Sequence, residues 1–282
     1  MTLRSGEVYF SERSNGFLLP ESISLFGLSI SFYGICLVLA ALIGILVISE
    51  VSRRKRLSVE WSLTLLAIVI IFALLGGRVY YVMFEWQKFA QNPLALLNFR
   101  SGGLSYFGAL FGAWFAVKWY CRKKGMDFLQ SADILCFGAA AAAPFVWCGC
   151  VFVKEPLGKR YDGLFSIRIP AEEFSQATEA LFVSMHPVAM YGIVLGIVAF
   201  IVLCVVLKKA KQPGTVFTAY LIVHAIIIGA LECFRSDPYC IWGTDIPVNF
   251  VVAGVILLTI IVGWGRQCSF NKKLKSIHFM SN

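Results

Sequence analysis

Seven apolar stretches, each close to the length needed to cross a membrane, constrain this chain more than any other feature. They cover residues 24–49, 62–84, 102–120, 130–153, 187–207, 216–233 and 247–265. About 20 apolar residues in a helix cross the ~30 Å hydrocarbon core of a bilayer. A backbone in lipid must satisfy its own hydrogen bonds, and a helix does so within one segment. The sequence therefore predicts an all-α, polytopic membrane protein with seven transmembrane helices.

The composition also indicates a membrane protein rather than a soluble one. Of 282 residues, 59% are hydrophobic and 15% are charged, whereas soluble domains carry about a quarter charged residues. We expect one integral membrane domain over residues 1–282, with an outside N-terminal segment at 1–23, an outside loop at 154–186 and a cytoplasmic tail at 266–282. Within that loop, "PAEEFSQATEALF" fits either a short amphipathic helix at the membrane surface or a plain loop.

Basic residues give the direction of the spans. More than half of the 25 lysines and arginines follow predicted spans one, three, five and seven, in the segments 53–56, 122–124, 208–211 and 266–275. Short cytoplasmic segments carry an excess of Lys and Arg. We therefore expect the N-terminus outside and the C-terminus in the cytoplasm. The net charge of +9 is a topology signal on this interpretation, and we expect no nucleic-acid partner.

Polar residues gather near the outer ends of the predicted spans. Ionisable groups inside a bilayer are costly and usually functional. Arg78 lies six residues from the outer end of span two, about 9 Å at 1.5 Å per residue. The other polar or small residues near outer ends are Tyr33, Gly102, Gly103, Ser105, Glu155, Gly158, His186, Tyr191, Glu232 and Arg235. Lys118 and Asp133 lie near cytoplasmic ends, where snorkelling accounts for them.

These residue types suit a lipid phosphate and proton transfer. The planar fork of arginine binds phosphate, and histidine, glutamate and tyrosine move protons. Structural interpretations stay open for each. Arg78 fits a snorkelling residue, His186 a helix-start residue, and Glu232 a partner of Arg235 three residues later. Glycines in span three fit close helix packing. The sequence holds no pattern of metal ligands and no cofactor-binding loop, so we expect neither.

Six motifs occur in an order and spacing that point to one protein family. They are Tyr33-Gly34, Gly77-Arg78-Val79-Tyr80-Tyr81-Val82, Gly102-Gly103-Leu104-Ser105-Tyr106-Phe107-Gly108, His186-Pro187 with Tyr191, Lys211-Gln212-Pro213-Gly214, and Glu232-x-x-Arg235-x-Asp237. Over residues 25–265 the chain resembles the prolipoprotein diacylglyceryl transferases. Those bacterial enzymes move diacylglycerol from phosphatidylglycerol to the lipobox cysteine of a prelipoprotein.

The resemblance implies a multi-pass enzyme of the bacterial cytoplasmic (inner) membrane that forms a thioether in lipoprotein biosynthesis. It implies phosphatidylglycerol, the signal peptides of prelipoproteins and the membrane as partners, and no cofactor. The implied catalytic residues are His186, Glu232, Arg235, Tyr33 and Tyr191, with His186 or Glu232 as the proton acceptor. The implied lipid-binding residues are Arg78, Gly102, Gly103, Ser105, Trp147, Gly149, Glu155 and Gly158.

The chain departs from the family pattern at several positions. Its counterpart of the family signature, "VWCGCVFVKE", keeps Gly149 and Glu155. Trp147 and Ile228 stand where two arginines thought to hold the lipid phosphate are expected. The remaining replacements are Phe107 for His or Tyr, Cys150 and Val153 for two asparagines, and Gly192 for a common Glu.

These departures leave three hypotheses open. The chain is a transferase in which Arg78, Lys154, Arg235 or His224 replaces the missing arginines. Alternatively, it is a catalytically altered or inactive relative that binds phospholipid or lipoprotein. A transporter or channel is the third hypothesis, and it requires a polar path across the whole bilayer.

The charge pattern predicts the accessibility of each loop. In a variant without native cysteines, single cysteines introduced at residues 53–56, 122–124, 208–211 and at the C-terminus should resist a membrane-impermeant thiol reagent in intact cells and react after lysis. A cysteine introduced at Asp162, in the outside loop, should react in intact cells. Labelling of 122–124 from outside would contradict the orientation.

Overall fold

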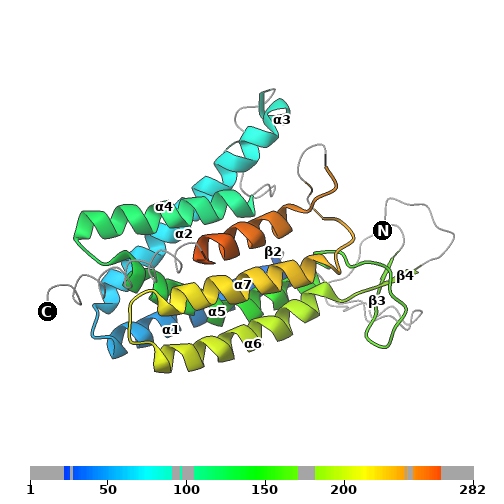
Figure 1. Ribbon diagram of the computed structural model, residues 1–282. Coiled ribbons are helices and arrows are strands. Elements are labelled where there is room, and N and C mark those ends of the chain that lie inside the picture. Colours follow the sequence, from blue (N-terminus) through cyan, green and yellow to red (C-terminus); the bar gives the residue numbers. More distant parts are fainter. Residues whose placement is uncertain are drawn as a thin grey trace, which may run out of the picture.

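The computed structural model describes residues 22–25, 28–90, 96, 105–170, 182–238, 240 and 244–261. The helices are α1 (Phe32–Arg54), α2 (Val59–Phe84), α3 (Trp86–Ala90), α4 (Tyr106–Lys124), α5 (Phe128–Phe152), α6 (Val188–Lys209) and α7 (Thr215–Glu232). A further apolar helix, Val248–Ile261, is coloured orange to red in Figure 1. Two antiparallel hairpins pair β1 (Ser22–Leu25) with β2 (Leu28–Ser31), and β3 (Ile167–Pro170) with β4 (Phe182–Met185).

A helix occupies each of the seven predicted positions, which confirms the all-α membrane class. Five helices, α1, α2, α5, α6 and α7, are long and apolar enough to cross a membrane. The 19 residues of α4 include Lys118, Arg122 and Lys123, and the described part of the last helix, 248–261, is shorter. Seven crossings and the orientation of the termini therefore stay predictions.

The helices form two packed groups. One contains α1, α5, α6 and α7, which pack in that order, and the other contains α2 and α4, which pack against each other. Figure 1 shows α2 rising obliquely past α4, with α3 at its far end. At one end of the described helices, α2 and α3 therefore extend away from the first group (Figure 1).

Glycines set the approach of α2 to α4. A Cβ atom at Gly108 would overlap the carbonyl oxygen of Gly76, and one at Gly112 would overlap the carbonyl oxygen of Phe72. Small residues let membrane helices approach until their backbones touch. This contact supports the packing interpretation for Gly108 and Gly112, whereas Gly102 and Gly103 lie outside the described residues.

The first helix begins later than expected, which corrects the predicted span of 24–49. Residues 22–25 and 28–31 form a hairpin in which Ser22 pairs with Ser31 and Ile23 with Ile30. Serine alternates with Ile or Leu in both strands, and this period of two is that of a strand. The apolar character of the segment hid the alternation, so the helix starts at Phe32.

The loop at 154–186, predicted to lie outside, contains both strands of the second hairpin. In the second hairpin Ile167 pairs with Met185, and Pro170 pairs with Phe182. Pro170 and Phe182 are also the first and last residues of "PAEEFSQATEALF". The residues between them, 171–181, lie outside the described part, so the choice between an amphipathic helix and a loop is not tested.

Asp133 of α5 joins three helices at the predicted cytoplasmic side. Its side chain is 1% exposed and accepts hydrogen bonds from the backbone N–H groups of Gly214 (3.0 Å) and Phe217 (2.7 Å). Lys55 Nζ, just after α1, lies 3.5 Å from the same carboxylate. A helix N-terminus has unpaired N–H groups and attracts negative charge. Asp133 therefore caps α7 from a neighbouring helix, and the snorkelling interpretation of this residue is wrong.

Replacing Asp133 should destabilise the protein far more than replacing an ordinary cap. Asp133→Ala removes two charge-assisted hydrogen bonds, each contributing about 1.5–3 kcal/mol. The matched control is Asp127→Ala, which removes the exposed N-cap of α5 and its bond to Gln130 N, a loss of about 1 kcal/mol. Thermal denaturation in detergent micelles should show the larger fall in Tm for Asp133→Ala. Equal falls would contradict the anchoring role.

Candidate functional site

Three aromatic residues from different segments surround the imidazole of His186, immediately before α6. Tyr161 stacks on it with ring centroids 4.1 Å apart and an interplanar angle of 12°. Phe234, just after α7, meets it edge-on at 5.1 Å. Tyr191 Oη lies 3.2 Å from His186 Nδ1. The ring is therefore held in one orientation, and its Nε2 has no hydrogen-bond partner among the described residues.

The chain after α5 ties the start of α6 to the end of α7. Gly158 forms a β-bridge with Arg235, and the neighbouring Lys159 N donates to Phe234 O at 2.8 Å. His186 N donates to Lys159 O at 3.0 Å. A Cβ atom at Gly158 would overlap the His186 carbonyl oxygen. Glycine is therefore needed at 158 for this approach, and three predicted site residues meet here.

Glu232, the last residue of α7, forms an ion pair that is largely shielded from solvent. Its side chain is 1% exposed, and Oε2 lies 3.6 Å from Arg235 Nη1. Asn249 Nδ2 donates to the same oxygen at 2.7 Å, while Arg235 Nη2 donates to the Asp237 carbonyl oxygen at 3.0 Å. Glu232 Oε1 has no hydrogen-bond partner among the described residues. The pairing that the sequence spacing suggested is therefore present, and it leaves one carboxylate oxygen for another group.

Asn249 is a site residue that sequence reasoning missed. It lies in the first turn of the helix 248–261. The available signal was a polar amide at the start of an apolar stretch, which alone does not reveal a contact 17 residues away with Glu232.

Tyr33 and Gly149 come together between α1 and α5. A Cβ atom at Gly149 would lie 2.9 Å from Tyr33 Cδ2 and 3.2 Å from Cys36 Cβ. Nearby, Phe32 stacks on Phe152 with ring centroids 5.0 Å apart. The missing side chain at Gly149 thus lets the first turn of α1 lie against α5.

Two of the departures from the family pattern are in contact. Gly192 is buried in α6, and a Cβ atom there would overlap the indole ring of Trp147 in α5. An arginine is expected at 147 and a glutamate is common at 192. The Trp147 indole therefore packs directly on the backbone of Gly192, and both positions carry charged residues in the family pattern.

Arg78 and Ser105 lie with the α2–α4 group. Arg78 is 5% exposed, its Nε donates to the Leu96 carbonyl oxygen at 3.0 Å, and its guanidinium lies 5.3 Å from the centre of the Phe89 ring. Ser105 N donates to Gly77 O at 3.0 Å. Arg78 therefore contacts Phe89 of α3 and Leu96, while the groups around His186 and Glu232 lie at the ends of α5, α6 and α7.

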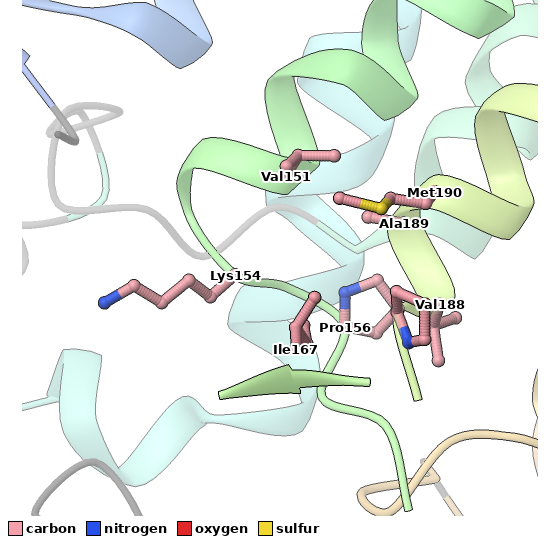
Figure 2. A pocket seen from close by; sticks show the side chains of 8 residues that line it. Val151, Lys154, Pro156, Ile167, Val188, Ala189 and Met190 are labelled. Atoms are coloured by element: carbon pink, nitrogen blue, oxygen red, sulfur yellow. The ribbon is translucent and has the colours of Figure 1, made fainter. Parts of the chain in front are cut away.

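A small cavity of about 20 Å³ lies beside the end of α5. Val151, Lys154, Pro156, Ile167, Val188 and Met190 are among the residues that line it, and Figure 2 shows the Lys154 side chain extending away from the apolar ones. The exposed Glu155 follows, with its backbone N bonded to Cys150 O at 3.2 Å. A volume of this size holds about one water molecule, so this cavity is too small for a lipid headgroup.

The contact between Trp147 and Gly192 predicts a strong dependence of one substitution on the other. Gly192→Ala should lower the Tm, because its Cβ overlaps the indole, and should be harmless in a Trp147→Leu background. We expect a coupling of about 1–3 kcal/mol, typical of overpacking. Gly254→Ala is the control, since a Cβ there meets nothing within 4 Å. Additive effects in denaturation experiments would argue against the contact.

The sequence matches one protein family along most of its length. Residues 20–265 match the family of prolipoprotein diacylglyceryl transferases. A Finegoldia magna protein named phosphatidylglycerol–prolipoprotein diacylglyceryl transferase is 27% identical over 241 residues, covering 84% of this chain and 93% of the relative. A Clostridioides difficile protein of that name is 29% identical over 216 residues, covering 77% and 83% respectively.

A third relative extends the match further. The Clostridium perfringens protein named phosphatidylglycerol–prolipoprotein diacylglyceryl transferase 1 is 26% identical over 257 residues, which is 88% of this chain and 96% of the relative. The family match covers α1 to α7 and the helix 248–261. The chain therefore belongs to the prolipoprotein diacylglyceryl transferase family.

Proposed function

We propose that the chain transfers the diacylglyceryl group of phosphatidylglycerol to the lipobox cysteine of prelipoproteins in a bacterial inner membrane. The names of the relatives support this substrate pair. The five membrane-length helices support access to both substrates from within a bilayer. The substrate cysteine supplies the nucleophile, and we expect neither a metal nor a cofactor.

One observation carries the proposal: a cation, a carboxylate and an imidazole meet at the joined ends of α5, α6 and α7. Arg235 pairs with Glu232, and its backbone forms a bridge with Gly158, which touches His186. Arginine has five N–H donors in a planar fork, a geometry that matches a phosphate as well as the carboxylate of Glu232. Charge-assisted bonds to phosphate are among the strongest hydrogen bonds in proteins.

The reaction requires one bond to form and one to break. The cysteine thiol loses its proton to His186 Nε2 or Glu232 Oε1, because the thiolate is the nucleophilic form. The sulfur attacks the glycerol carbon that carries the phosphate ester. The carbon–sulfur bond forms as the carbon–oxygen bond breaks, and glycerol phosphate leaves with the electron pair. Arg235 stabilises the negative charge on that leaving group.

A second candidate function is lipid or lipoprotein binding without transfer. The observation that favours it is the packing of Trp147 on Gly192, which fills space where the family pattern has an arginine. Ile228, the second replaced arginine, lies on the same helix face as Glu232, one turn away. If Arg235 does not replace both charges, the protein binds lipid but does not transfer the diacylglyceryl group.

Replacing Arg235 should strongly reduce transfer while the protein stays inserted. The assay expresses each variant in a bacterium depleted of its own transferase and measures lipoprotein modification by mobility shift. Loss of a phosphate contact of about 1.5–3 kcal/mol predicts at least a tenfold loss for Arg235→Ala and partial activity for Arg235→Lys. The control is Arg168→Ala, an exposed arginine in β3.

Two outcomes would contradict this role or the activity itself. Full activity in the charge-swapped variant Glu232→Arg with Arg235→Glu would reduce the pair to a structural ion pair. A wild-type chain that inserts normally, binds phosphatidylglycerol vesicles and yet fails to rescue would reject transfer and favour the binding function.

A further inference from the structure

A second polar cluster lies deeper along α7, at a level that the proposed mechanism does not use. His224 precedes Glu232 by eight residues, about 12 Å along the helix axis at 1.5 Å per residue. Residues four apart lie on one face of a helix, so His224, Ile228 and Glu232 form one stripe. The polar groups of this stripe are therefore at two depths, with an apolar residue between them.

Tyrosines from two helices contact His224. Tyr106, the first residue of α4, places Oη 2.5 Å from His224 Nε2. Tyr220, one turn earlier in α7, stacks on the imidazole with ring centroids 5.4 Å apart and an interplanar angle of 11°. Tyr106 is 45% exposed, so molecules in the surrounding membrane can reach the pair.

The cluster has hydrogen-bond donors left over. Tyr106 and His224 share one hydrogen bond, whichever group donates. A neutral imidazole and a phenol carry two polar hydrogens, so in either tautomer one hydrogen of the pair remains. Neither His224 Nδ1 nor Tyr220 Oη has a hydrogen-bond partner in the described part of the chain. Two donors are therefore available in a region where hydrocarbon offers no acceptor.

Helix packing alone does not account for this cluster. The α4 helix already packs on α2 through Gly108 and Gly112, and α7 packs on α5 and α6. Hydrogen bonds between membrane helices contribute little to stability on average, whereas an unsatisfied donor in hydrocarbon is costly. A hydrogen-bond acceptor from a molecule outside the chain would satisfy the two donors.

We propose that Tyr106, His224 and Tyr220 bind an ester carbonyl of the diacylglyceryl group of a membrane phospholipid. An ester carbonyl accepts hydrogen bonds and donates none, which matches the leftover donors. In a diacyl phospholipid the ester carbonyls lie deeper in the membrane than the phosphate. A phosphate held by Arg235 therefore directs them along α7 toward His224. The inference rests on the proposed function for the position of the phosphate, and it specifies which other part of the lipid is recognised.

The test compares two lipids that differ only in their carbonyl groups. The full-length protein in detergent micelles is titrated with dioleoyl phosphatidylglycerol and with its dialkyl ether analogue, and binding is followed by native mass spectrometry. The wild-type protein should prefer the ester lipid about three- to twentyfold, the range expected for hydrogen bonds in membranes. Tyr106→Phe and His224→Phe should bind the ester lipid as weakly as the ether lipid. His224→Asn, which keeps an N–H donor, should recover part of the preference.

Tyr120→Phe is the matched control. Tyr120 is the other tyrosine of α4 and packs with Leu65 and Val117 in an apolar cluster, so this variant should keep the full preference. Equal binding of the two lipids by the wild-type protein would overturn the proposal. Variants that weaken the binding of both lipids equally would also overturn the proposal, because that result would assign the Tyr106–His224 bond to helix packing.

The binding test separates this inference from the proposed transfer. A preference for ester lipid in a protein that fails the rescue assay would reject the transferase function and leave the carbonyl site standing. Rescue by a protein without the preference would reject only the carbonyl site.

Discussion

The carboxylate of Asp133 holds the start of α7, and α7 carries Tyr220, His224 and Glu232. Two backbone N–H groups of α7 donate to this one side chain. A shift of α7 by one residue would move it 1.5 Å and rotate it by about 100°. Such a shift would separate His224 from Tyr106 and Glu232 from Asn249. A charge buried near one membrane surface therefore sets the geometry of groups near the other.

The end of the bundle around His186 depends on backbone contacts as much as on side chains. Gly158 and Lys159 run between His186 and Phe234 and bond to both ends, so the imidazole and the Glu232–Arg235 pair belong to one assembly. The replaced positions Trp147 and Ile228 remove charge from this region while the assembly itself remains. Transfer and simple lipid binding both fit such a site, and they differ in whether Arg235 alone can hold the leaving phosphate.

The helices were predictable because an apolar stretch of about 20 residues has few alternatives in lipid. The β1–β2 hairpin could not be predicted in the same way, because its alternation of Ser with Ile or Leu runs directly into an apolar stretch that is typical of a helix. Asp133 was misread because its partners, Gly214 and Phe217, lie more than 80 residues away. The Glu232–Arg235 pair is local in sequence and was foreseen. Asn249 and the Tyr106–His224 bond depend on packing between distant segments, which one sequence without its structure does not reveal.

The indole of Trp147 against Gly192 also limits the order in which this chain can change. A side chain larger than hydrogen at 192 overlaps the ring, so a glutamate there is disfavoured while Trp147 is present. In the opposite direction, the tryptophan fits only after glycine is present. The two positions are therefore coupled: a larger side chain at 192 fits best after Trp147 has been replaced by a smaller residue, and Trp147 fits best with glycine at 192.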